Sequence, residues 1–148
     1  MTELALPKID KKTLDKKDYI FKSLAKLINP EHVLSHKDEI KPYETDGLSA
    51  YKQTPLAVVM PENTKEVSSI LKFCYEENIK VVPRGAGTGL SGGALPLQDA
   101  VLLSLGKFNK ILDIDFENKC WHYSHYVNLQ IPRISFEFIY RYLASPSF

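Results

Sequence analysis

Residues 81–93 read Val81-Val82-Pro83-Arg84-Gly85-Ala86-Gly87-Thr88-Gly89-Leu90-Ser91-Gly92-Gly93 and hold five of the seven glycines in the chain. Glycine permits a positive φ, and because it has no Cβ it lets a ligand lie directly against the backbone. Successive backbone N–H groups in such a loop can form a concave nest that binds anions, typically phosphate. Thr88 and Ser91 add hydroxyl donors and Arg84 adds a positive charge. The stretch therefore predicts a loop that binds a diphosphate.

Two common phosphate motifs fit this stretch poorly. Residues 87–92 match the letters of the Rossmann fingerprint, which needs a helix opening at the second or third glycine. Gly93 and Pro96 follow at once and no helical pattern begins, so a Rossmann-like dinucleotide module remains only an alternative interpretation. A Walker-type loop needs a lysine after its last glycine, and no lysine occurs between Lys80 and Lys107.

A strand, a helix and a second strand precede the glycines. The strand is predicted at residues 56–60 and the helix starts with Thr64 as its N-cap. Lys80-Val81-Val82 forms the second strand, which a crossover of this kind places parallel to the first. The glycines then lie outside the carboxyl end of that strand, where α/β sheets commonly bind ligands. The apolar face of the helix is predicted to consist of Val67, Ile70, Leu71, Cys74 and Tyr75, and Asn78 ends the helix; further strands are predicted at 100–105 and 110–115.

Residues 83–93 resemble the diphosphate loop of the FAD-linked oxidoreductases of the p-cresol methylhydroxylase and vanillyl-alcohol oxidase (PCMH/VAO) type. The stretch is similar to the FAD subunit of glycolate oxidase and to the related D-lactate dehydrogenases. The likeness extends to residues 43–51, 55–61 and 111–115. It implies an α/β (α+β) fold, namely a PCMH-type FAD-binding domain with an N-terminal α/β subdomain and an incomplete second subdomain, preceded by a short helical region. The implied domains are a helical and loop extension over 1–54 and the FAD-binding domain over 55–148, family-like to about residue 120.

The resemblance also implies a function. The chain is expected to bind FAD as the N-terminal part of a flavin-dependent 2-hydroxy-acid oxidoreductase of the glycolate or D-lactate type. In this family the catalytic histidines and the acid-binding arginines lie in a substrate domain further downstream. No catalytic residue and no metal ligand is therefore assigned, and whether the chain is itself an enzyme stays open. FAD is the expected partner, together with other subunits of a glycolate-oxidase-like complex.

Cofactor binding is assigned to the glycine-rich stretch. Residues 85–89 are expected to supply the N–H groups for the diphosphate, and residues 90–93 to extend the nest toward the ribose or the ring. No His, Cys or Tyr occurs from Pro83 to Leu105, so FAD is expected to bind non-covalently. Tyr43 and Asp46 are either cofactor-side residues or parts of an ordered loop with a turn at Asp46-Gly47. The cofactor-binding residues are Pro83, Arg84, Gly85, Ala86, Gly87, Thr88, Gly89, Leu90, Ser91, Gly92 and Gly93.

The first forty residues predict a mobile or solvated lead-in followed by a helix. Residues 8–17 are rich in lysine, and Asn29-Pro30 ends the helix. His32 and His36 would share one face if residues 31–38 were helical, but a zinc site needs three or four ligands and no third one is evident. The apolar residues of the helix recur at helical spacing, which predicts packing on the chain's own core or, alternatively, on a partner: Ile20, Phe21, Leu24, Leu27 and Ile28.

Composition gives no indication of nucleic-acid or membrane binding. The formal net charge is +1 with histidines neutral, and no apolar run approaches the roughly 20 residues that span a bilayer. The start of the sequence has neither the basic nor the apolar part of a secretory signal. Cys74 and Cys120 lack metal-ligand spacing. We therefore expect a cytoplasmic protein with two reduced thiols and no transmembrane segment.

The sequence changes character after Cys120. Residues 121–148 contain eight aromatic side chains, no glycine and one acid, Glu137. In the resembling family a Pro-Gly turn and a helix follow at this place, whereas Trp121 to His125 and Pro132 do not fit them. One hypothesis is that the reading frame or chain is damaged near Cys120, which leaves the front end of a longer flavoprotein. An aromatic, basic helix at a membrane surface is the alternative. A non-functional truncated remnant that binds no cofactor is the alternative to a FAD-binding fragment.

Overall fold

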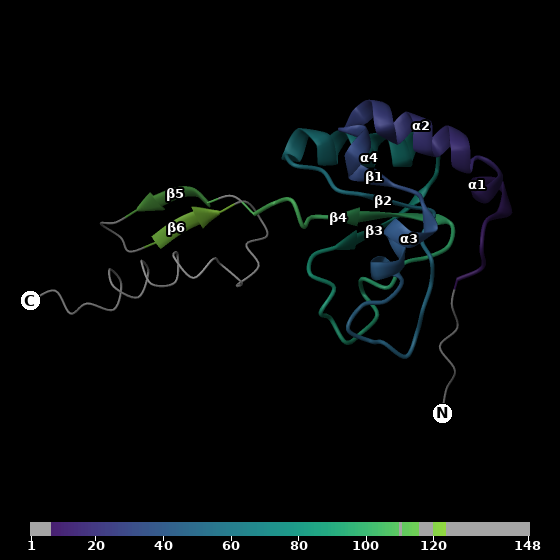
Figure 1. Cartoon of the computed structure of the whole chain (residues 1–148). Helices are drawn as coiled ribbons and strands as arrows, with labels where there is room; N and C mark the ends of the chain where they lie inside the picture. Colours follow the sequence, from purple (N-terminus) through teal and green to yellow (C-terminus); the bar gives the residue numbers. More distant parts are fainter. Residues whose placement is uncertain (1–6, 110, 116–119, 124–148) are drawn as a thin grey trace, which may run out of the picture. The chain divides into compact units, whose positions relative to one another are not determined.

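The computed structural model describes residues 7–109, 111–115 and 120–123 (Figure 1). The chain divides into two compact units, with the boundary between Leu105 and Gly106. The helices are α1 (Lys11–Asp15), α2 (Lys17–Leu27), α3 (Lys37–Ile40) and α4 (Thr64–Glu76), with 3-10 turns η1 (Pro30–His32) and η2 (Lys41–Tyr43). The strands are β1 (Val33–Leu34), β2 (Ala57–Val59), β3 (Lys80–Arg84), β4 (Ala100–Ser104), β5 (Ile111–Asp115) and β6 (Cys120–Tyr123).

The first unit contains a four-stranded sheet in the order β1-β2-β4-β3. β1 is antiparallel to β2, whereas β2, β4 and β3 are parallel, with Leu102 opposite both Val58 and Val82. The predicted parallel arrangement of the strands around α4 is thus confirmed. These two strands are not neighbours, however, because β4 lies between them. All five residues of β4 are buried, as expected of a central parallel strand that is covered on both faces.

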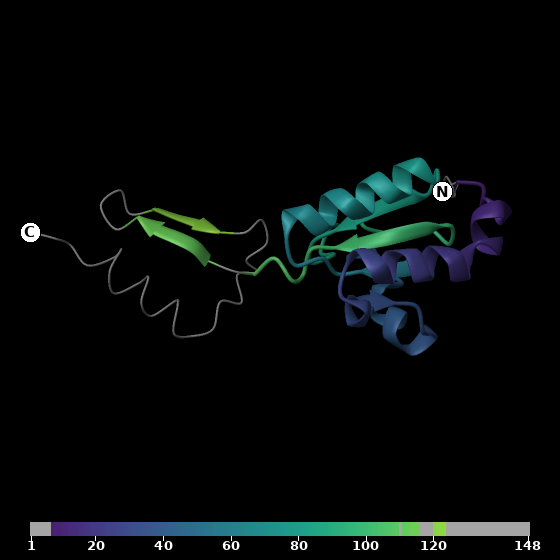
Figure 2. The same cartoon turned by 90° about the horizontal axis from the view of Figure 1, so that it is seen from above.

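Helices cover both faces of this sheet (Figures 1 and 2). α2 and α4 lie side by side over one face, where Leu24 and Ile70 are fully buried in the larger apolar cluster. α3 lies on the other face, where Ile40 packs with Val58 and Leu102. The alternation of side chains along a strand sends neighbouring strand residues to these two clusters in turn. The amphipathic helix predicted from the apolar residues between Ile20 and Ile28 is α2. It packs on the chain's own core, which was one of the two alternatives; the other was a partner protein.

The predicted apolar face of α4 is partly wrong. Leu71 and Tyr75 are 44% and 87% exposed, whereas Phe73 packs against the core. α2 runs along the Phe73 side of α4, and the rings of Tyr19 and Phe73 lie with their centroids 6.4 Å apart. The buried stripe therefore extends toward Phe73 and not toward Tyr75. In α2 the same kind of difference leaves Leu27 36% exposed at the helix end.

Both ends of α4 are capped by asparagine. The N-cap is Asn63 and not Thr64, because the Asn63 side chain accepts a hydrogen bond from the backbone N–H of Glu66 at 3.0 Å. At the other end Asn78 has a φ of 55°. The N–H of Ile79 donates to the Cys74 carbonyl at 2.7 Å, which is the Schellman arrangement. Asn78 thus ends the helix as predicted and aims the chain into β3.

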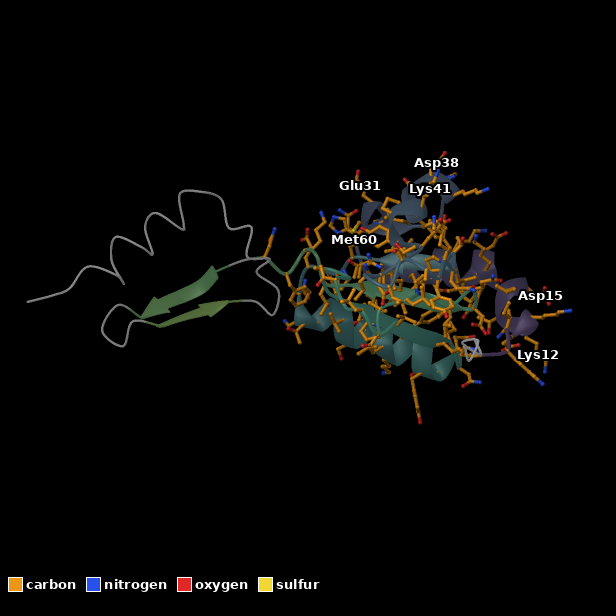
Figure 3. All side chains as sticks on the ribbon, turned by 90° about the horizontal axis from the view of Figure 1, so that it is seen from below. Lys12, Asp15, Glu31, Asp38, Lys41 and Met60 are labelled. Carbon is orange, nitrogen blue, oxygen red and sulfur yellow. The ribbon has the colours of Figure 1, made fainter. Side chains whose placement is uncertain are left out.

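The lysine-rich lead-in contains a helix. Asp10 caps α1 by accepting the N–H of Lys12, and Thr13 is buried, whereas Lys12 and Asp15 point outward (Figure 3). The backbone N–H of Asp10 also donates to the carboxylate of Asp99 at 2.7 Å. The lead-in is solvated as predicted, with residues 8–12 and 15–17 exposed, but it also contains a short helix that the sequence did not predict. The helix was not predicted because its five residues are too few to show a helical period. The sequence signal that could have indicated it is the capping residue Asp10.

Asp99 joins this lead-in to the start of two parallel strands. Its carboxylate is 3% exposed and accepts from Lys80 Nζ at 2.7 Å as well as from the Asp10 N–H. Burial raises the pKa of the Asp99 carboxyl, but the hydrogen bond from Lys80, the backbone N–H groups of Asp10 and Asp99 and the Lys80 charge outweigh it. The net pKa lies below the ordinary 3.8. Asp99 is therefore ionised in the folded protein at neutral pH.

Cys74 is expected to resist thiol reagents. Its side chain is 1% exposed in the core, and burial raises the pKa of the thiol from 9.0 to about 11. Since the folded-state pKa exceeds the unfolded value, the thiol lowers the free energy of unfolding only as the pH rises from 9.0 toward about 11. In a Cys120→Ser variant, Ellman's reagent at pH 8 should label no thiol in native buffer and one thiol in denaturant. Rapid labelling in native buffer would contradict the burial of Cys74.

The second unit contains an antiparallel pair of strands. β5 and β6 pair with Ile111 opposite Tyr123 and Asp115 opposite Cys120, with a register irregularity between Ile111 and Asp113. β5 confirms the last predicted strand, whereas β6 occupies part of the segment that fitted no family pattern. The hypotheses on the aromatic tail concern residues 124–148, which lie outside the described residues. None of the helices within the described ranges has the length and hydropathy that crossing a bilayer requires.

Candidate functional site

The glycine loop, defined as residues 85–93, leaves the carboxyl end of β3. Since β3 and β4 are parallel, the chain must return from the carboxyl ends of the strands to their amino ends before β4 begins at Ala100. Residues 94–99 make this return, with Leu95 and Pro96 buried. The loop therefore lies outside the carboxyl ends of the strands, where α/β proteins commonly bind ligands, as the sequence predicted.

The backbone of the loop has no helical segment. Residues 85–99 form bends and turns only, so no helix opens after Gly92. Gly87 and Gly92 have φ values of 72° and 73°, in the region that favours glycine. The Rossmann interpretation requires a helix N-terminus at this point and is therefore wrong. The alternative in which backbone N–H groups form the site agrees with this conformation.

A second segment, residues 43–48, runs directly against the glycine loop and is called the support segment. A Cβ added to Gly47 would come within 2.6 Å of the Thr88 carbonyl oxygen and 2.7 Å of that of Gly89. No side chain larger than glycine fits there without a shift of backbone. Gly47 is thus required by close approach of two loops that are about 40 residues apart in sequence.

Two polar side chains also join the support segment to the glycine loop. Asp46 is 6% exposed and accepts from the N–H of Leu48 at 2.9 Å and from that of Ala94 at 3.3 Å. Arg84 donates from Nη1 to the Thr45 carbonyl. The arginine thereby connects the last residue of β3 to the support segment.

The guanidinium of Arg84 is further placed by Tyr43 and Gly87. Its central carbon lies 5.6 Å from the centroid of the Tyr43 ring, within the range of a cation–π contact. The Tyr43 hydroxyl in turn donates to the sulfur of Met60 at 3.5 Å; Met60 is labelled in Figure 3. A Cβ added to Gly87 would overlap the guanidinium. From the sequence, Tyr43 and Asp46 were either cofactor-side residues or parts of an ordered loop. Their contacts match the second alternative.

The other side of the glycine loop is open. A Cβ added to Gly89 or Gly93 would meet no atom of the described residues within 4 Å. Residues 88–91 are exposed, and Leu90 is 74% exposed although it is apolar. One side of the loop thus rests on the support segment and the other is free to receive a ligand.

The N–H groups of the loop are available as hydrogen-bond donors. Within the described ranges, no backbone N–H from residue 85 to residue 93 donates a hydrogen bond. The carbonyls of Thr88 and Gly89 lie next to Gly47, with the Thr88 carbonyl side-on to it. Such an arrangement binds an anion through backbone donors.

The two histidines of the N-terminal region do not share a helix. His32 ends η1 and is buried, whereas His36 precedes α3, with β1 between them. The Nε2 atom of His32 lies 3.8 Å from a carboxylate oxygen of Glu62, and its Nδ1 has no hydrogen-bond partner among the described residues. No group of three potential metal ligands occurs in the part of the chain that the structure describes.

Comparison with known proteins links this loop to a family. Residues 55–124 match the protein family described as FAD binding domain. The chain is 45% identical over 111 residues to glycolate oxidase subunit GlcD of Escherichia coli (strain K12), covering 75% of this chain and 21% of that protein. It is 36% identical over 103 residues to the mitochondrial D-2-hydroxyglutarate dehydrogenase of Arabidopsis thaliana, covering 70% and 18%. The chain thus spans about a fifth of the length of these curated relatives.

Solved structures share the fold. A p-cresol methylhydroxylase with bound substrate superposes with a TM-score of 0.61 at 26% identity, covering 74% of this chain and 21% of that one. An alkyldihydroxyacetonephosphate synthase gives a TM-score of 0.60 at 18% identity, covering 80% and 23%, and supports the fold alone. The mixed α/β fold and the family predicted from the sequence are both confirmed. The chain belongs to the FAD-binding domains of the p-cresol methylhydroxylase and vanillyl-alcohol oxidase type.

Proposed function

We propose that the glycine loop of this chain binds the diphosphate of FAD non-covalently. The observation that carries the proposal is the run of backbone N–H groups over residues 85–93 that have no hydrogen-bond partner among the described residues, on a loop whose one side is open. A diphosphate presents several anionic oxygens within a few ångströms, and hydrogen bonds to charged acceptors are about twice as strong as neutral ones. The residues assigned to the cofactor from the sequence, 83–93, thus have the chemistry that the family's cofactor requires.

We further propose that the chain is the nucleotide-binding part of a 2-hydroxy-acid oxidoreductase of the glycolate or D-lactate type. The support for this is the likeness to glycolate oxidase subunit GlcD and to D-2-hydroxyglutarate dehydrogenase. Bound FAD would supply the acceptor for a hydride from the carbon that bears the substrate hydroxyl. The residues of this chain would bind and orient the nucleotide end of the cofactor. Because that first relative is named as a subunit, further subunits are proposed as partners of this chain.

Alanine substitutions on the open side test the cofactor proposal. Gly89→Ala and Gly93→Ala each add a methyl group that meets no protein atom within 4 Å, at glycines whose φ lies outside the left-handed region. We expect unchanged unfolding of the ligand-free chain and an affinity for FAD that falls about tenfold, the equivalent of about 1.4 kcal/mol. The loss arises because the methyl group separates the diphosphate from the backbone donors. Titration of the chain with FAD, followed by flavin fluorescence and the visible spectrum, measures it.

The outcomes of this titration are distinct. If the wild-type chain leaves the flavin spectrum unchanged at every FAD concentration, the cofactor proposal is wrong for this chain. If FAD binds but both alanine variants bind equally well, the diphosphate lies elsewhere. Acid precipitation of the complex should release all flavin into solution, since no His, Cys or Tyr occurs over residues 83–105. A yellow pellet would contradict non-covalent binding at this loop.

A further inference from the structure

The conformation of the glycine loop must be held by contacts that offset its loss of conformational entropy. Glycine loses more conformational freedom on folding than any other residue, and five glycines occur within nine residues. The N–H groups of residues 85–93 donate no hydrogen bonds within the described ranges, so the loop is not held by its own backbone donors. Whatever fixes its conformation before a ligand arrives must come from outside the loop.

The support segment meets this need at both ends of the loop. Arg84 ties the start of the loop to the Thr45 carbonyl, and Asp46 ties its end through the N–H of Ala94. Gly47 lies against the carbonyls of the middle of the loop. These contacts leave the N–H groups of residues 85–93 without a hydrogen-bond partner among the described residues.

Arg84 uses its guanidinium for these contacts. The side chain is half-buried, lies over the Tyr43 ring and donates to Thr45. A planar guanidinium can stack on an aromatic ring and donate to a carbonyl at the same time, which a lysine ammonium does not reproduce. Its contacts therefore lie with the support segment, behind the loop.

We propose that Asp46 and Arg84 are positioning residues that hold the glycine loop in its ligand-ready conformation before the nucleotide binds. A preorganised loop loses less conformational entropy on binding, which increases affinity without an additional contact. The identity of the ligand rests on the proposed function above, whereas the order of the loop does not. Neither side chain needs to touch the diphosphate.

Conservative variants separate positioning from direct charge contact. In Asp46→Asn only one oxygen remains as an acceptor, and the new NH₂ group faces a backbone N–H that previously donated to a carboxylate. Arg84→Lys keeps the positive charge but loses the planar group. Glu44→Gln is the matched control, because Glu44 lies in the same segment, makes the same change of charge and contacts Thr54 instead of the glycine loop.

The loop's mobility is measured in the ligand-free chain by ¹⁵N relaxation of the glycine amides. In the wild type and in Glu44→Gln we expect backbone order parameters near the rigid value of about 0.85, and in Asp46→Asn and Arg84→Lys values below about 0.6. The amides of α4 and β4 should remain rigid in all four proteins. Wild-type glycine amides as mobile as those of the two variants would overturn the proposal, whether or not FAD binds.

The affinity for FAD provides the second measurement. Asp46→Asn and Arg84→Lys are each expected to weaken binding about tenfold with an unchanged salt dependence, and the control to change it less than about twofold. If Arg84→Lys binds FAD like the wild type while Arg84→Met does not, Arg84 is a charged ligand of the diphosphate and its positioning role is wrong. If no protein of the set binds FAD, the proposed function fails, and the relaxation data alone decide whether the two residues order the loop.

Discussion

Gly47→Ala is expected to lower the affinity for FAD by about 10- to 100-fold, although Gly47 lies outside the glycine loop. The added Cβ would come within 2.6 Å of the Thr88 carbonyl oxygen and 2.7 Å of that of Gly89, and both are backbone atoms that no rotamer change can move. Either the loop or the support segment must shift, and overpacking of this kind costs about 1–3 kcal/mol. Urea unfolding of the ligand-free chain and titration with FAD measure the two effects.

Gly93→Ala is the matched control for this prediction. It makes the same chemical change within the loop, but its methyl group meets no protein atom within 4 Å. We expect Gly47→Ala to lower both stability and affinity, and Gly93→Ala to lower affinity alone. A Gly47→Ala variant with wild-type stability and wild-type affinity would show that the two loops do not lie in contact. That result would also remove the structural basis for the positioning role of Asp46.

The sequence predicted the parts of the fold that follow from local patterns. The apolar runs at 56–60 and 100–105 and the helical period between them correspond to β2, β4 and α4. Asn78 ended the helix as predicted, because an αL residue after a helix is a local requirement. The position of the glycine loop followed from the order of strand, helix and strand. The strand and helix predictions each rest on residues fewer than about 15 apart in sequence, where period and capping are informative.

The support segment could not be predicted in the same way. Its contacts join Thr45 to Arg84 and Asp46 to Ala94, and no periodic pattern relates residues so far apart. Asp46-Gly47 is an ordinary turn dipeptide, and nothing in it indicates that the carboxylate also accepts from the far end of the glycine loop. The insertion of β4 between β2 and β3 was missed for a related reason. A crossover defines parallel direction, but the neighbour of a strand is decided by packing of the whole sheet.

The lead-in illustrates a third limit of local reasoning. Residues 8–17 contain many lysines, and such composition is typical of solvated segments. These lysines are exposed, but one contact that the composition does not indicate fixes the segment, because the Asp10 N–H donates to a carboxylate that lies 89 residues later. Nothing in the sequence around Asp99 indicates this contact, since an aspartate before a strand is common in turns. Its importance comes from burial, which only the fold can provide.

Asp99→Asn is expected to lower the free energy of unfolding by about 1.5–3 kcal/mol at pH 7, the range measured for hydrogen bonds to charged groups. The carboxylate oxygen that accepts from both Lys80 and Asp10 is replaced by an amide, which leaves Lys80 without its ion-pair partner. The loss stays below that of a fully buried ion pair because the Lys80 side chain is 42% exposed and regains water. Urea unfolding at constant ionic strength measures the difference.

Glu76→Gln is the control, because it removes one partner of the exposed ion pair between Lys72 and Glu76. Exposed pairs contribute about 0–1 kcal/mol, so this variant should unfold close to the wild type. Equal destabilisation by both substitutions would mean that the Asp99 carboxylate is hydrated and not buried. The comparison therefore tests whether the lead-in is fastened to the sheet or only lies near it.

The pH dependence of the free energy of unfolding is an independent test of the role of Asp99. The folded-state pKa of Asp99 lies below its ordinary value of 3.8, so the stabilisation it provides is complete above that pH and is lost as the pH falls through the folded-state pKa. The difference in free energy of unfolding between the wild type and Asp99→Asn should consequently be constant from pH 7 to pH 5 and shrink below about pH 4. A difference that grows in acid would mean that the folded protein holds the carboxyl in its protonated form. In that case the ion pair with Lys80 would not be what fastens residues 8–10 beneath the strands that carry the glycine loop.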